Sequence, residues 1–219
     1  MCFSIEASFI ASFFLAVVAI ASFLKVKSQG VLGSAKLGLI AIPAGFSVQQ
    51  FCEGFVWLAL LNNHVGWLKD LAIYGFIFFA FIFWPVYMPF CIYRLEQNHT
   101  VQNFLKIFMT IGLCVAGLLL ERVLYFGITA QLASCHIMYQ SHATQFSPLL
   151  FWLAMGAYLI TTVGSTIIST FPGMRLVGIL IGIAYLGAYL FYVNFFISVW
   201  CFFAAIISLL VYWLMSQKN

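Results

Sequence analysis

Long apolar segments recur along the chain at intervals typical of membrane-spanning helices. A helix needs about 20 apolar residues to cross a bilayer. Five such runs are separated by short polar or turn-forming stretches, and the apolar region 176–215 is long enough for two more, divided near Val193-Asn194. The expected helices cover residues 7–24, 36–61, 71–93, 104–126, 148–170 and the two halves of 176–215. The pattern predicts an all-α membrane protein, a single seven-transmembrane-helix bundle over residues 1–219.

Prolines and polar stretches divide these segments. Pro85 and Pro89 fall inside the third segment, where their missing amide hydrogens predict a kink. Pro172-Gly173 predicts the turn before the sixth segment, and residues of about 129–147 are expected to form a long loop. The first segment has no basic residues before it, so we expect it to be retained as a helix and not removed as a signal peptide.

Basic residues are distributed unevenly between the two ends of the expected bundle, and this distribution sets its orientation. If the N-terminus lies outside, seven of them fall on the inner side, and the outer loops hold only Lys69. The inner residues are Lys25, Lys27, Lys36, Arg94, Lys106, Arg175 and Lys218. The sequence therefore predicts an N-terminus outside and a cytoplasmic C-terminus.

The composition agrees with burial in lipid. Hydrophobic residues make up 65% of the chain and charged residues only 6%, whereas soluble domains contain about 25% charged residues. The net charge of +4 comes from scattered basic residues and gives no indication of a nucleic-acid-binding surface, so no nucleic-acid partner is expected. The expected partner is the lipid bilayer, and a homo-oligomer or another membrane protein is left open as a further partner.

The second segment carries an unusual polar group in apolar surroundings. Gln49, Gln50 and Glu53 lie within five residues on one helix face, and Trp57 extends that face by one turn. A carboxyl group inside a bilayer costs roughly 2.5–3.5 kcal/mol on insertion scales, so it is expected to have a partner or a task. The predicted orientation places all four residues in the outer half of the bundle.

Three further candidates share that outer half: Glu121, Arg122 and Trp200. Glu121 and Arg122 are adjacent in sequence and are not expected to face each other on a helix. Arg122 would then pair with Glu6 or Glu53. These residues predict an outward-facing ligand pocket between helices. The alternative is purely structural, with Glu53 paired to Arg122 and the glutamines hydrogen-bonding across helices.

A metal site is a second hypothesis for the outer end. The loop around Cys135 and His136 is rich in soft and borderline ligands that suit copper or zinc. Cys2, Glu53 and Cys201 are expected at a similar depth. The cysteines show no C-x-x-C pair, and a disulfide among Cys2, Cys135 and Cys201 is the competing interpretation.

Several other sites are disfavoured or structural. Retinal would need a lysine in the seventh helix, and that helix contains none; haem would need buried histidines, and all four histidines fall in expected loops. No nucleotide-binding, metalloprotease or serine-hydrolase motif occurs. Five hydroxyl residues in the fifth segment are expected to bond back to helix carbonyls: Thr161, Thr162, Ser165, Thr166 and Ser169. A pore-lining role for them is left open.

Short motifs spread over nearly the whole chain resemble an uncharacterised family of small bacterial integral membrane proteins that begin Met-Cys-Phe-Ser. They are Met1-Cys2-Phe3-Ser4-x-Glu6-Ala7-Ser8-Phe9, Gln49-Gln50-x-x-Glu53-Gly54-x-x-Trp57, Trp84-Pro85-x-Tyr87-x-Pro89, His136-Ile137-x-Tyr139 and Ser198-Val199-Trp200-Cys201-Phe202-Phe203-Ala204-Ala205. The resemblance implies a bacterial, multi-pass protein of the cytoplasmic membrane and carries no established activity.

Three functions remain open at this point. The leading hypothesis is a receptor-like or sensor-like protein whose outward-facing pocket binds a small ligand or metal ion, with Glu53 as its central anion and Arg122 as the counter-charge. The second is a transporter or channel with Glu53 in the path and the Trp84-Pro85 kink as a gate. The third is a metal-dependent membrane enzyme that uses Glu53 as acid and base.

Overall fold

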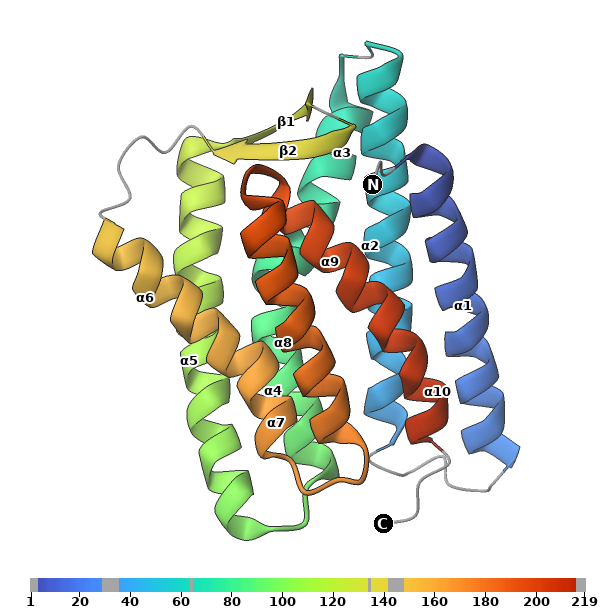
Figure 1. The fold of residues 1–219 in the computed structure, drawn as a ribbon, viewed down its shortest axis with the longest axis vertical. Coiled ribbons are helices and arrows are strands. Elements are labelled where there is room, and N and C mark those ends of the chain that lie inside the picture. Colours follow the sequence, from blue (N-terminus) through green and yellow to red (C-terminus); the bar gives the residue numbers. More distant parts are fainter. Residues whose placement is uncertain (1–3, 29–35, 64, 134, 142–147, 216–219) are drawn as a thin grey trace.

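The computed structural model describes residues 4–28, 36–63, 65–133, 135–141 and 148–215 (Figure 1). Within these ranges seven helical segments are long and apolar enough to cross a membrane, which confirms the predicted number. Four of them are single helices, of which three are α1 (Ile5–Ser28), α2 (Leu37–Leu61) and α5 (His99–Phe126). A fourth, α8 (Met174–Phe191), follows the predicted turn, where Gly173 adopts a φ of 84°.

The other three segments change helix type along their length. α3 (Trp67–Ile77) continues through the π-helical turn η1 (Phe78–Phe83) into α4 (Trp84–Leu95). α6 (Pro148–Leu159) continues through the π-helical turn η2 (Ile160–Gly164) into α7 (Ser165–Ile168). The last segment joins η3 (Val193–Phe195), α9 (Phe196–Ile207), η4 (Ser208–Leu210) and α10 (Val211–Leu214).

The predicted irregularity beside Pro85 takes the form of the π-helical turn η1. Pro85 has no amide hydrogen to donate to the preceding turn, and a π-helical turn accommodates such a local mismatch without ending the helix. A hydroxyl from another helix bonds to this turn, because Tyr158 Oη donates to the Ala80 carbonyl at 2.5 Å. Tyr158 lies in α6 two residues before η2, so its side chain links the helix end that leads into η2 to the turn η1.

The prediction of an all-α chain is wrong for the region expected to be a loop. Residues Ile128–Ala133 form strand β1 and His136–Ser141 form strand β2, paired antiparallel with Ile128 opposite Ser141. Buried Ile128 and Ala130 alternate with more exposed neighbours, as expected for a strand with one covered face. The hairpin lies across the end of the bundle at which α1 begins, and α10 ends at the opposite end (Figure 1).

Four of the five hydroxyl groups predicted to bond to helix carbonyls in the fifth segment do so, whereas Ser169 donates to the Glu96 carboxylate. Thr161 and Thr162 both donate to the Tyr158 carbonyl at 2.8 Å, and Ser165 donates to the Thr161 carbonyl at 2.6 Å. Thr166 donates to the Val163 carbonyl at 2.6 Å. Because these donors are satisfied inside their own helix, the series forms a packing face.

Glu96 is a buried carboxylate at the end of the bundle away from the hairpin. It accepts hydrogen bonds from the amides of Gln97 and Asn98 at 3.0 Å and from the amide of Thr170 at 2.8 Å. The hydroxyls of Thr170 and Ser169 also donate to it. The carboxylate therefore ties the turn between α4 and α5 to the turn that follows α7.

We expect Glu96→Gln to destabilise the protein by about 2 kcal/mol at neutral pH, because hydrogen bonds to a charged group are replaced by weaker ones. Burial alone would raise the Glu96 pKa, but the hydrogen bonds from Thr170, Asn98 and Gln97 outweigh it and hold the pKa below its ordinary value. The contribution of a carboxylate with a lowered pKa is complete above the unfolded-state pKa of about 4.3 and is lost as pH falls through the folded-state pKa.

Thermal unfolding of the detergent-solubilised protein between pH 7 and pH 3 measures this effect. The difference in stability between wild type and Glu96→Gln should be constant from pH 7 to about pH 5 and should shrink below about pH 4. A difference that stays constant over the whole range would show that the Glu96 charge is not the stabilising feature.

Candidate functional site

The Glu53 carboxylate lies at the centre of a buried polar network between α2 and α9. Its side chain is 1% exposed. Gln50 Nε2 donates to Glu53 Oε2 at 3.0 Å, and Ser198 Oγ donates to Glu53 Oε1 at 2.5 Å. One turn away, Trp84 Nε1 donates to Gln49 Oε1 at 2.8 Å. The expected face of α2 is thus joined to α9 through Ser198 and to α4 through Trp84.

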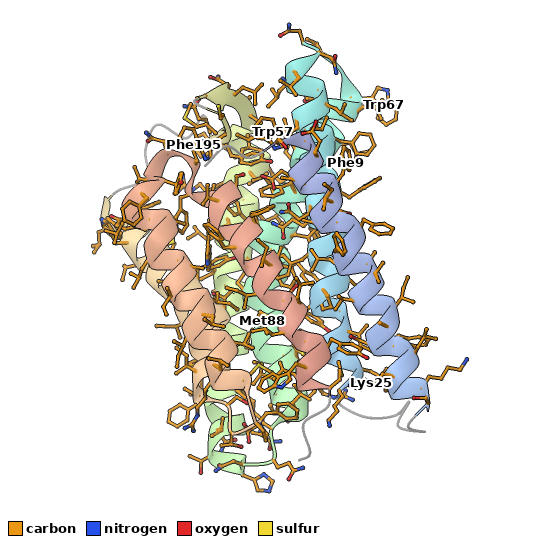
Figure 2. All side chains as sticks on the ribbon, turned by 45° about the vertical axis from the view of Figure 1, so that its right-hand side comes forward. Phe9, Lys25, Trp57, Trp67, Met88 and Phe195 are labelled. Atoms are coloured by element: carbon orange, nitrogen blue, oxygen red, sulfur yellow. The ribbon has the colours of Figure 1, made fainter. Side chains whose placement is uncertain are left out.

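Helix α2 can hold this network because other elements surround it. It packs against α1, α3, α9 and β1, and Gly54 lets it approach the Phe9 ring closely. A Cβ at Gly54 would lie 2.7 Å from the Phe9 ring, so a larger residue would force the ring to move. Figure 2 shows Phe9 and Trp57 close to the same end of the bundle.

The predicted ion pair between Arg122 and Glu53 does not form. Glu53 bonds to Gln50 and Ser198, whereas Arg122 Nε lies 3.3 Å from Glu121 Oε2. The expectation that adjacent residues could not pair is wrong, because the long side chains of Glu121 and Arg122 bend toward each other near the end of α5. The Arg122 guanidinium also lies 5.3 Å from the Phe126 ring centroid.

A cavity of about 430 Å³ lies beside this network, beneath the hairpin. We call it the hairpin cavity. Its walls come from α5, α6, α9, η1, η3 and both strands, and most of the lining side chains are apolar. The polar lining residues are Arg122, Tyr139, Ser141, Tyr158, Asn194, Ser198, Trp200 and Cys201. Ser198 therefore connects the cavity to the Glu53 carboxylate behind it.

Buried polar atoms near the cavity lack hydrogen-bond partners in the described part of the chain. They include Tyr139 Oη, Trp200 Nε1, Trp57 Nε1 and Gln50 Oε1. An unsatisfied buried polar group costs roughly 1–3 kcal/mol, and the great majority of such groups in native proteins are paired. Tyr139 and Trp200 line the hairpin cavity, so they are positioned to bond to a molecule inside it.

The described residues among those proposed for a metal site are not gathered into one. Within the described ranges, no three His, Cys, Asp or Glu residues lie close enough to hold a metal ion. His136 is buried and stacks on Phe195 with ring centroids 4.7 Å apart. Cys135 is exposed at the hairpin turn, whereas Cys201 is buried beside Glu53 and Gln49. Cys2 lies outside the described residues.

Cys201 is a free cysteine in this structure, so the disulfide proposed between Cys135 and Cys201 does not form. The other two pairings proposed in the sequence analysis involve Cys2, which lies outside the described residues.

Comparison with known proteins adds one match. The profile of a family of unknown function, DUF6629, matches residues 1–219. The chain belongs to the DUF6629 family. Neither the search of curated proteins nor the search of solved structures found a match. The expectation of an uncharacterised family that spans the whole chain is confirmed, and its bacterial origin stays a prediction.

Ser198, Tyr139 and Tyr158 complete the site of this DUF6629 protein, and the sequence analysis gave none of them a role. Ser198 and Tyr139 stand in the motifs that carried the resemblance, which is the one signal that could have pointed to them. Tyr139 stacks on Phe76 with ring centroids 4.7 Å apart. Burial, and then the nearby Glu53 carboxyl, raise the Tyr139 pKa well above its ordinary value, so its hydroxyl keeps its proton.

A second, smaller cavity of about 50 Å³ lies deeper in the DUF6629 bundle. It shares Tyr158, Trp200 and Cys201 with the hairpin cavity, and these three side chains separate the two spaces. Its remaining lining is apolar except for Thr162, Ser208 and the Trp84 ring. Both hydroxyls already donate to backbone carbonyls. The polar lining of the hairpin cavity is therefore not continued through the described residues of this cavity.

Proposed function

We propose that this protein is a multi-pass membrane protein that binds a small ligand in the hairpin cavity and acts as a receptor or sensor. The cavity carries the proposal: its volume of about 430 Å³ falls in the range of small-molecule sites, roughly 300–1,000 Å³. Such sites combine an apolar lining with a few polar groups that fix the ligand. Tyr139 and Trp200 offer polar atoms of this kind that have no hydrogen-bond partner among the described residues.

Membrane insertion is supported by the surface of the helices. Large apolar side chains are exposed along α1, α5, α6 and α8, among them Phe13, Leu113, Leu153 and Ile183. Soluble monomers rarely expose apolar patches of such extent. The proposed location is the cytoplasmic membrane of a bacterium.

The distribution of basic residues supports an orientation with the hairpin outside. Figure 2 shows Lys25 at the end of the bundle opposite Trp57 and Phe195. Lys36, Arg94 and Arg175 also lie at element ends away from the hairpin, beside the turns that close that end. By the positive-inside rule this end is cytoplasmic and the hairpin cavity faces outward.

Signalling is favoured over transport by the change in lining below the hairpin cavity. A polar or ionic substrate crossing the bundle would need polar groups beyond Tyr158, Trp200 and Cys201. There the lining is apolar apart from Thr162, Ser208 and the Trp84 ring, and the hydroxyls of η2 and α7 bond to their own helix or to the end of α6 before it. A bound ligand touches α5, α6, α9 and the hairpin at once, so binding can shift these elements relative to each other.

The proposal is tested by blocking the cavity. Met155 on α6 lines it, and its neighbour Leu153 is 59% exposed on the outer side of the same helix. We expect a ligand to co-purify with wild type and Leu153→Trp and to fall at least tenfold in Met155→Trp, because the indole fills the cavity. Native mass spectrometry of protein purified from its own membranes measures the bound mass. Equal ligand in both tryptophan variants, or none in wild type, would contradict the proposal.

A further inference from the structure

The mouth of the hairpin cavity is half apolar and half polar. Its exposed lining residues are Phe151 at the start of α6, Ser141 at the end of β2, and Val193 with Asn194 in η3. Phe151 is 42% exposed and Val193 62% exposed. The start of α6 lies at the outer edge of the bundle, from which the helix runs obliquely inward (Figure 1). The opening therefore lies at the side of the bundle, where lipid meets the polar hairpin.

The interior of the cavity offers apolar contact and one charge. Ala80, Phe81, Leu119, Val123 and Ile137 supply much of the wall. Arg122 is the one charged side chain among the described lining residues. A cation in a low-dielectric wall attracts an anion far more strongly than it would in water, and a guanidinium suits oxyanions because its donors match their geometry.

Glu121 pairs with Arg122 and is not among the residues that line the cavity. Its side chain is 58% exposed, against 23% for Arg122. Exposed ion pairs contribute only about 0–1 kcal/mol, and the Glu121 carboxylate can rotate into water without leaving a buried charge. A ligand oxyanion can therefore displace Glu121 from Arg122 at small cost.

The part of the cavity wall formed by Ser198 cannot bind an oxyanion in the way that Arg122 can. The Ser198 hydroxyl hydrogen is donated to Glu53 Oε1, so Ser198 presents only acceptor lone pairs to the cavity. An oxyanion has no hydrogen to donate to them. The two walls therefore fix the direction of an amphiphile, with its anionic head at Arg122.

We infer that the ligand is an anionic amphiphile with a single apolar chain, which enters through the side opening and pairs its oxyanion head with Arg122. This inference rests on the proposed function and names its ligand class. A carboxylate head and a phosphate monoester head share the required chemistry. The apolar chain would lie against Phe81, Leu119 and Val123.

The test uses the full-length protein in nanodiscs of neutral phosphatidylcholine, with laurate, dodecyl phosphate, dodecanol and acetate as probes. We expect one laurate or one dodecyl phosphate per protein, at least tenfold weaker binding of dodecanol, and no binding of acetate. The ratio of laurate to dodecyl phosphate affinity identifies the preferred head. Native mass spectrometry counts the bound probes.

Two charge variants on α5 should act in opposite directions. Arg122→Gln should weaken the binding of both anionic probes at least tenfold and leave the binding of dodecanol unchanged. Glu121→Gln should strengthen the binding of the anionic probes, because it removes the competing carboxylate. This second variant keeps the inference testable if Arg122→Gln fails to fold. Lys69→Gln removes a cation that lies outside the cavity lining and is the matched control. It should change neither the binding of the anionic probes nor the binding of dodecanol.

The ligand class would be overturned by equal binding of laurate and dodecanol, or by no binding of either anion. It would also be overturned if neither α5 variant changed the affinity for the anionic probes. If Met155→Trp still displaces a neutral or cationic co-purified ligand, the proposed function stands while this inference falls. If Met155→Trp retains all ligand, the cavity is not the site and both fall.

Discussion

Gly112→Ala is expected to destabilise the protein by about 3 kcal/mol or more, at the upper end of overpacking effects. A Cβ at Gly112 would lie 2.9 Å from the carbonyl carbon of Pro85 and closer still to its oxygen. Both atoms belong to the backbone of α4, so no side chain can rotate away. Helix α5 would have to move off α4, whose first residue, Trp84, holds Gln49 in the buried network.

Gly117→Ala on the same helix is the matched control. Among the described residues, no atom outside its own stretch of helix lies within 4 Å of the position that its Cβ would occupy. Alanine favours a helix over glycine by about 1 kcal/mol, so this variant should be neutral or slightly stabilised. Thermal unfolding in dodecylmaltoside measures both variants, and equal stabilities would contradict the close packing of α5 on α4.

Glu53→Leu should destabilise the protein by about 2–6 kcal/mol, because it leaves two buried donors without an acceptor. Those donors are Gln50 Nε2 and Ser198 Oγ, and each unsatisfied donor costs about 1–3 kcal/mol. Glu53→Gln should cost much less. The new amide oxygen can accept from Ser198. Gln50 can turn its own amide so that its Oε1, which has no partner among the described residues, accepts from the new amide group.

The same unfolding assay separates these two variants. A Glu53→Leu protein as stable as Glu53→Gln would show that the carboxylate contacts are not stabilising, as occurs when some buried polar groups are replaced by well-packed apolar ones. Laurate binding by Glu53→Gln should match that of wild type, because the head binds at Arg122. This readout separates the structural role of Glu53 from ligand contact.

The seven helices could be predicted because each depends on local apolar composition. Their ends were less accurate, and α5 begins five residues earlier than expected. The cause is Asn98, whose Oδ1 accepts from the amides of Thr100 and Val101 and so begins the helix in a polar stretch. The hairpin was missed because six-residue strands with loose alternation resemble a polar loop.

The site could be predicted only where its residues share one helix. The face of Gln49, Gln50 and Glu53 follows from helix periodicity, and the structure places these residues together as expected. Ser198 is 145 residues away from Glu53 in sequence, and no local pattern indicates that contact. Glu96 was passed over because a carboxylate in a polar loop has the sequence signature of an ordinary surface residue.

Ligand binding by this protein depends most directly on what occupies the hairpin cavity. The measurement is an electron cryo-microscopy map of the protein with a bound antibody fragment, in nanodiscs formed from its own membranes. The map shows what the cavity contains. We predict non-protein density in the space lined by Tyr139, Trp200 and Met155, continuous from the opening at Phe151 toward Arg122. A cavity closed by rearranged side chains, or one whose density is water alone, would contradict ligand binding at this site.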